Sequence, residues 1–178
     1  MVPLAALLVE GIQVSFSLYP TAALIQLGGF REDMAYAEDY DLNLRIHRAG
    51  YRFFLFDTPS AKLRQHHGHR LTHPTSGRVF GSLDKIYRDH LAAFDARAEG
   101  PLRLDERTGY AQQIWQVARW AARQGCIAEA RQLFALATEI AGRKAWFGSW
   151  KIRLLYNFAD PVTCEIVDGG AKRLLGRW

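Results

Sequence analysis

The sequence contains very little cysteine, which excludes two classes of protein. Of its 178 residues, only Cys126 and Cys164 are cysteines. Two cysteines this far apart cannot provide a disulfide framework or a cysteine-rich zinc site. We therefore expect a reducing, cytoplasmic setting.

Long hydrophobic runs are also missing, although 49% of the residues are hydrophobic. No stretch approaches the roughly twenty apolar residues that a membrane-spanning helix needs. The apolar start MVPLAALLV has no basic residues in front of it and is followed at once by Glu10, unlike a secretory signal peptide. We predict a globular chain with neither a membrane span nor a signal peptide.

The chain has no glycine-rich phosphate-binding loop of the GxGxxG or Walker type. The pair Gly28-Gly29 follows an apolar helical pattern and is interpreted as a helix stop with a tight turn. The net charge of +5 would suit anionic partners such as nucleotide phosphates or anionic lipid, but it cannot choose among them. We expect no nucleic acid partner.

Strand and helix patterns alternate in the first part of the chain. Apolar alternation or apolar runs predict strands at 12–18, 51–56 and 61–65, and helical patterns lie between them at 20–27 and 39–49. The sequence therefore predicts an α/β unit at residues 1–75.

Helical periodicity replaces the strand signals after this point. It predicts helices at 79–94, 109–124, 127–140 and 146–158, and hence an all-α region at 76–178. Small residues at about 109–141 have spacings that resemble one tetratricopeptide repeat, a hairpin of two helices. Partner binding and simple packing of the hairpin both remain open.

Three carboxylates, Glu38, Asp39 and Asp41, lie at the start of the helix predicted at 39–49. Acidic residues in a first helical turn are stabilised by about 0.3–1 kcal/mol each, because free backbone N–H groups gather there. Asp41 can also pair with Arg45, one turn further on. Local chemistry alone therefore explains the cluster as a helix start.

The wider order of motifs is more specific. VSFSLY, GGF, EDYDL, RAGY and LRQHHG follow one another between residues 10 and 72. This series resembles the second half of the catalytic domain of inverting, family-two glycosyltransferases, which have the GT-A, Rossmann-like fold. The resemblance implies an α/β, partial GT-A fragment followed by an all-α C-terminal region.

The resemblance also implies an activity, the transfer of a sugar from a nucleotide-sugar donor to a saccharide or lipid-linked acceptor with inversion. Asp39 matches the general base, while Glu38 and Asp41 support it. Gly29 belongs to the turn that shapes the substrate side. We expect the helix start to lower the pKa of Asp39. Because no donor-binding half is recognised, the resemblance implies a truncated form that is inactive alone.

The complete family enzyme implies a divalent cation, Mn or Mg. Asp39 and Asp41 spell a DxD, but a metal-binding DxD ends a hydrophobic strand, whereas this pair begins a helix. By the resemblance, Arg64 is a substrate-binding residue and His66 a metal ligand near the diphosphate. The neighbouring histidines, His67, His69 and His73, are interpreted as a solvated loop, since they lack a fixed ligand spacing.

The late segment KAWFGSWKIRLLYNF places Trp146, Trp150, Leu154 and Phe158 four residues apart, near Lys144, Lys151 and Arg153. A basic, aromatic helix of this kind suits peripheral contact with an anionic membrane. Burial against the preceding helices explains the apolar stripe equally well. The alternative to an enzyme is thus a non-catalytic interaction module, a degenerate transferase whose helical tail binds a protein or membrane.

Overall fold

The computed structural model describes residues 1–10, 12–13, 17–34, 37–56, 58, 62, 80–81 and 83–174. In this part of the chain the regular elements are helices and no strand occurs, so the predicted α/β class is wrong. The elements are α1 (Leu4–Glu10), α2 (Thr21–Gln26), α3 (Glu38–Arg48), α5 (Leu83–Asp95), α6 (Leu104–Arg123), α7 (Ile127–Ala141), the short 3₁₀ helix η2 (Gly142–Ala145), α8 (Trp150–Leu155) and α9 (Pro161–Leu174).

The segment 51–56 shows the physical reason for this error. It was predicted to be a strand from its apolar run, yet Phe54, Leu55 and Phe56 are 65%, 85% and 81% exposed. A short apolar run does not reveal whether other parts of the chain cover it. The predicted strands at 12–18 and 61–65 lie partly outside the described residues, and their described members are not in strands.

Two helices of the first part lie where the sequence predicted them. Pro20 precedes α2 with a φ of −61°, and Gly28 and Gly29 end the helix with φ values of 74° and 64°. Only glycine adopts such angles readily, which explains the GG pair. The helix α3 ends at Arg48, and Gly50, two residues further on, has a φ of 93°.

The apolar start of the chain forms a helix that the sequence patterns did not predict. Leu7 and Leu8 of α1 are almost completely buried, because α1 packs against both α3 and α6. Gly109 of α6 allows this close approach, since a Cβ atom at that position would lie 2.8 Å from Cγ2 of Val9. The early apolar residues thus build the core.

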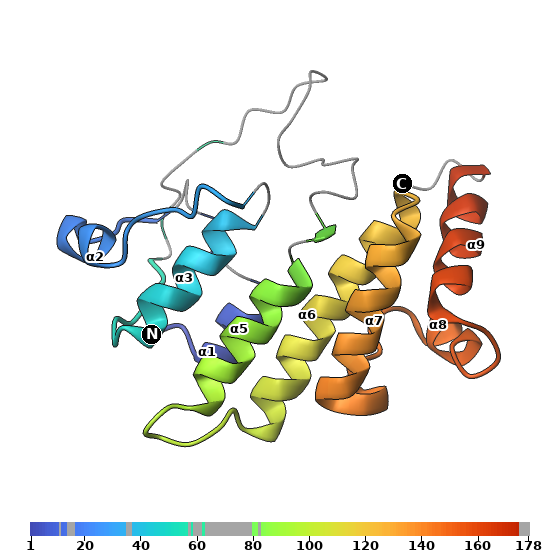
Figure 1. Ribbon diagram of the computed structural model, residues 1–178. Coiled ribbons are helices and arrows are strands. Elements are labelled where there is room, and N and C mark those ends of the chain that lie inside the picture. The colour runs from blue at the N-terminus through green and yellow to red at the C-terminus, as the bar shows by residue number, and fades with distance from the viewer. Residues whose placement is uncertain are drawn as a thin grey trace.

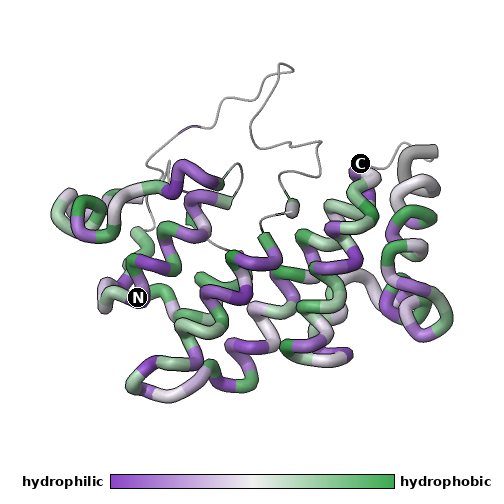
Figure 2. Tube along the Cα trace, in the orientation of Figure 1, coloured by the Kyte–Doolittle hydropathy of each residue, from purple (hydrophilic) through white to green (hydrophobic). Residues whose placement is uncertain are grey.

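The helices surround one continuous hydrophobic core. Figure 1 shows α5, α6 and α7 side by side, with α2 and α3 at one end of the molecule and α8 and α9 at the other. Figure 2 shows hydrophilic and hydrophobic residues alternating along these helices, as expected when one face of each is buried. The core joins Tyr40 and Leu44 of α3 to Trp115 of α6 and Leu133 of α7. The boundary predicted at 75 lies outside the described residues, and the division into two domains stays a prediction.

The helices predicted in the second part are present, with different bounds. Those predicted at 109–124 and 127–140 correspond to α6 and α7, and α6 begins five residues earlier, at Leu104. The helix predicted at 146–158 is shorter, because α8 covers Trp150–Leu155 only. The sequence patterns did not predict α9. The likeness of the α6–α7 hairpin to a tetratricopeptide repeat stays a prediction.

A buried ion-pair cluster attaches the last two helices to α6. Glu165 of α9 is completely buried, and its carboxylate accepts hydrogen bonds from Arg119 Nε at 2.6 Å and from Arg123 Nε at 2.9 Å. The hydroxyl of Tyr156 also donates to Glu165. Burial, together with this bond, raises the pKa of Tyr156 well above its ordinary value.

None of the helices in the described ranges has both the length and the apolar character needed to cross a membrane.

Candidate functional site

The helix α3 begins in an unusual way for a helix that carries three acidic residues in its first turn. Its N-cap residue is Ala37, which has no side chain able to cap the helix and a left-handed backbone with a φ of 61° and a ψ of 25°. A non-glycine residue in this region is strained by about 1–2 kcal/mol. The carboxylate of Asp39 accepts a hydrogen bond from the backbone N–H of Tyr40 at 2.8 Å. The surrounding structure therefore holds a start that the local sequence does not favour.

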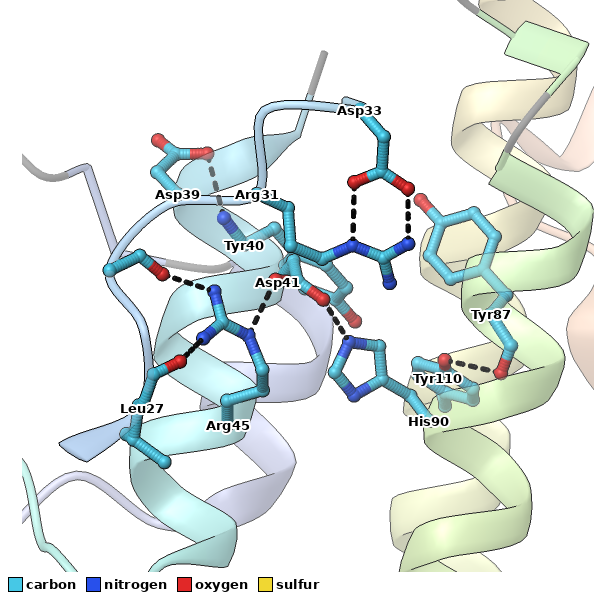
Figure 3. Close-up of polar contacts among 11 residues, drawn as sticks. Leu27, Arg31, Asp33, Asp39, Tyr40, Asp41, Arg45, Tyr87, His90 and Tyr110 are labelled. Carbon is cyan, nitrogen blue, oxygen red and sulfur yellow. Dashed lines mark hydrogen bonds and ion pairs between the residues drawn. The ribbon is translucent and has the colours of Figure 1, made fainter. Parts of the chain in front are cut away.

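Asp41 is enclosed and paired on both oxygens. Its side chain is 2% exposed, Arg45 Nε lies 2.7 Å from Oδ2, and His90 Nε2 lies 2.9 Å from Oδ1 (Figure 3). Burial alone would raise the pKa of Asp41, but the bonds from His90 and Arg45 outweigh it and hold the pKa below its ordinary value. The predicted pairing of Asp41 with Arg45 is confirmed. His90 is buried, and its other ring nitrogen, Nδ1, has no partner among the described residues.

Arg45 joins this helix to the glycine turn after α2. Its guanidinium donates from Nη1 to the carbonyl oxygen of Leu27 at 2.8 Å and from Nη2 to that of Gly29 at 2.7 Å. The same side chain holds Asp41, so one residue connects the GGF and EDYDL motifs in space. The carbonyl oxygen of Gly29 thus accepts a hydrogen bond from Arg45, and the predicted role of Gly29 on the substrate side stays a prediction.

Asp39 is in a different environment. It is half-buried, and Figure 3 shows its carboxylate apart from the group formed by Asp41, Arg45 and His90. Burial raises the pKa of Asp39, and the charge of Glu38 raises it further. The hydrogen bond from the Tyr40 backbone lowers the pKa but does not cancel these effects. The expectation that the helix start would lower this pKa is wrong, because loss of solvent outweighs the backbone N–H groups.

Two neighbours of Asp39 were missed by the sequence patterns. The hydroxyl of Tyr19 donates to Asn43 Oδ1 at 2.8 Å, and Asn43 Nδ2 donates to the carbonyl oxygen of Ile12 at 2.6 Å. Burial raises the pKa of Tyr19, and the nearby charge of Asp39 contributes to the shift. Asn43 lies one turn after Asp39 among apolar positions of α3, a signal that could have identified it.

The remaining predicted site residues are less informative. Glu38 is exposed, in the first turn of α3. Arg64 and His66 lie outside the described residues, as do His67, His69 and His73. Over the ranges that the structure covers, no group of three or more His, Cys, Asp or Glu residues could hold a metal ion. The predicted Mn or Mg site therefore has no counterpart there.

The chain matches no family model, no curated protein and no solved structure. The geometry of the helix start and of its contacts is therefore the basis for assigning a function.

Proposed function

We propose that this chain is a glycosyltransferase-like protein in which Asp39 takes the proton from an acceptor hydroxyl. The observation that carries this proposal is the difference between the two aspartates of EDYDL. Asp41 has both oxygens engaged, one in an ion pair with Arg45 and one in a hydrogen bond with His90, whereas Asp39 is half-buried, with a raised pKa. A raised pKa makes a carboxylate a better base. The difference supports Asp39 as the base and Asp41 as a residue that holds the helix in place.

The proposed reaction uses Asp39 as a positioned proton acceptor. A hydroxyl of the acceptor sugar gives its proton to an Asp39 oxygen while its own oxygen attacks the anomeric carbon of the donor sugar. The bond from that carbon to the nucleotide diphosphate breaks, and its electron pair leaves on the phosphate oxygen. Attack from the face opposite the leaving group inverts the configuration. The hydroxyl of Tyr19 and the side chain of Asn43 are suited to orient sugar hydroxyls near this base.

The substrate classes belong to the same proposal. They are a nucleotide-sugar donor and a saccharide or lipid-linked acceptor. We assign no step to Mn or Mg, because the described residues offer no metal-ligand group and His66 lies outside them. Cys126 and Cys164 are free thiols, which supports the proposed reducing, cytoplasmic setting.

A non-catalytic interaction module is the second candidate function. The observation that favours it is the exposed stripe of Trp150, Leu154 and Phe158 at the far end from α3. An exposed apolar stripe of this kind marks an interaction surface. In this alternative, Asp39 is an ordinary acidic residue of a helix start.

The decisive experiment follows the Asp39 carboxyl carbon by NMR while neutral hexoses, hexosamines and disaccharides are added. We expect at least one saccharide class to shift the Asp39 resonance, and the Asp39→Asn variant to bind that saccharide at least about ten-fold more weakly, equivalent to roughly 1.4 kcal/mol. Asp33→Asn is the matched control, because Asp33 is an exposed carboxylate, 67% accessible, in the loop before α3. If no saccharide moves the Asp39 signal, Asp39 does not face an acceptor and the proposal fails.

A second measurement concerns the donor. Calorimetry with nucleotide sugars and manganese should show no binding to the isolated chain, because the resemblance covers the acceptor side only. Clear micromolar binding would show that the donor is held here after all. It would also show that the resemblance to the acceptor side alone does not describe the whole binding site of the chain.

A further inference from the structure

The stripe on α8 settles an alternative that the sequence left open. Ile152 and Tyr156 are 4% and 6% exposed and face the core, whereas Trp150, Leu154 and Phe158 are 71%, 53% and 82% exposed. Residues four apart share one helical face, so Trp150 and Leu154 point outward together, and Phe158 follows just after the helix. Trp146 is half-buried, with its ring centroid 5.7 Å from that of Tyr156. Burial therefore explains Trp146 but not the other three.

Within the segment that carries the stripe all charges have the same sign, and the next acidic residue along the chain is Asp160. Between Arg143 and Phe158 the sequence has four basic residues, Arg143, Lys144, Lys151 and Arg153, and no acidic residue. All four are exposed, and Lys151 Nζ lies 5.8 Å from the centroid of the Trp150 ring. The nearby acidic side chains of α9 are already used, because Glu165 pairs with Arg119 and Arg123, and Asp168 pairs with Arg123.

The helix that carries the stripe is held to the core by the residues on its opposite face. The hydroxyl of Tyr156 donates to Glu165, which in turn binds Arg119 and Arg123 of α6. The Tyr156 ring packs edge-on against Trp115, with 5.2 Å between the ring centroids. The inner face of α8 is thus fixed to the core, so substitutions on its outer face can be made without disturbing the packing.

We propose that α8 and the residues that follow it bind the surface of an anionic lipid bilayer. Exposed Trp and Phe side chains are suited to the headgroup region, which has hydrocarbon on one side and water on the other. The surrounding Lys and Arg side chains complement anionic headgroups. A protein groove would need acidic residues placed to match four separate cations, whereas a lipid surface offers its charge everywhere. This proposal is independent of the role of Asp39.

The test measures binding of the full chain to vesicles of phosphatidylcholine alone and of phosphatidylcholine mixed with phosphatidylglycerol, by co-sedimentation. We expect binding to the mixed vesicles only, weakened by added salt because salt screens surface charge. Brominated phospholipid should quench tryptophan fluorescence in the wild-type protein. The Trp150→Phe variant should lose most of this quenching, because Trp150 is the exposed tryptophan of α8.

Two variants and their matched controls separate the apolar and the charged contributions. Trp150→Ser with Phe158→Ser should weaken vesicle binding roughly ten-fold or more. Lys151→Gln with Arg153→Gln should weaken it roughly 25-fold, from about five-fold for each cation. The controls, Leu104→Ser and Arg131→Gln, change exposed residues outside α8 and should leave binding unchanged.

Three results would overturn the proposal. The first is no binding to anionic vesicles, and the second is equal binding to neutral and anionic vesicles. The third is a stripe variant that binds as well as the wild type while circular dichroism shows the same helix content. If the apolar variant instead changes the oligomeric mass without any vesicle binding, the stripe joins copies of this chain and the lipid proposal is wrong.

Discussion

Arg45 Nη2 lies 2.7 Å from the carbonyl oxygen of Gly29, so the last turn of α3 is bonded directly to the glycine turn that follows α2. The same guanidinium holds Asp41 at 2.7 Å. The GGF and EDYDL motifs, which are separate in the sequence, are therefore joined in the structure. Asp39 lies in the second of them, in the first turn of α3.

Replacing Arg45 by Gln should destabilise the protein strongly. The side chain of Arg45 is 18% exposed, and its loss leaves the buried Asp41 with His90 alone and two carbonyl groups without their donor. We expect the free energy of unfolding to fall by about 2–4 kcal/mol. Urea denaturation measures this value. The control is Arg88→Gln, because Arg88 is 45% exposed and its surface ion pairs should contribute about 1 kcal/mol or less. Equal losses in the two variants would show that Arg45 has no special role.

The pKa of Asp39 should lie above the ordinary Asp value of about 3.9, and the pKa of Asp41 should lie below it. The lowered pKa of Asp41 means that its stabilisation is present above the unfolded value and is lost as pH falls through the folded value. The raised pKa of Asp39 means that ionising it costs stability, fully so above its folded value. NMR titration of the carboxyl carbons should therefore place the midpoint of Asp39 above that of Asp41. Asp39→Asn should leave the stability at pH 7 unchanged or slightly higher. The reverse order of midpoints would contradict the assignment of base and support.

Substituting glycine at the start of α3 should stabilise the protein. Ala37 has a φ of 61°, which glycine adopts without strain. Ala37→Gly should therefore raise the free energy of unfolding by about 0.5–1 kcal/mol. The same substitution at Ala135, exposed in the middle of α7, should lower it by about 1 kcal/mol. A loss in both variants would mean that the left-handed start is not populated in solution.

Removing the buried carboxylate of α9 should loosen the end of the molecule. Glu165→Ala leaves Arg119 and Arg123 without the anion that both contact, and we expect a loss of about 3–5 kcal/mol. Tryptophan fluorescence should follow the change, because Trp115 lies against Tyr156 in the same cluster. Glu139→Ala is the control, since Glu139 is 61% exposed and pairs only at the surface. If both variants unfold at the same urea concentration, the cluster does not attach α9.

The parts of the structure that depend on neighbouring residues were predictable from the sequence. Each of three features involves residues within about one helical turn: the glycine turn after α2, the end of α3 just before Gly50, and the pairing of Asp41 with Arg45. The helix periodicity of α6 and α7 extends over several turns and gave their positions as well.

Other parts depend on contacts that a single sequence does not reveal. His90 lies 49 positions after Asp41, so the hydrogen bond between them could not be expected from spacing. The helix α1 is covered by α3 and α6, so it has no polar face. Without a polar face its sequence lacks the apolar periodicity that indicates a helix. The raised pKa of Asp39 depends on burial, which is a property of the whole fold. The prediction of a strand at 51–56 was wrong for the same reason, because Phe54, Leu55 and Phe56 are exposed rather than covered by other parts of the chain.

The contact of α1 with α6 has a consequence for how the chain is made. Val9 fits against Gly109, which is synthesised a hundred residues later. During synthesis α1 cannot make this contact until α6 has left the ribosome, so its leucines lack the cover of α6 until then. The helix that carries Asp39 packs on α1, so its surroundings depend on a contact that the early part of the chain makes with α6.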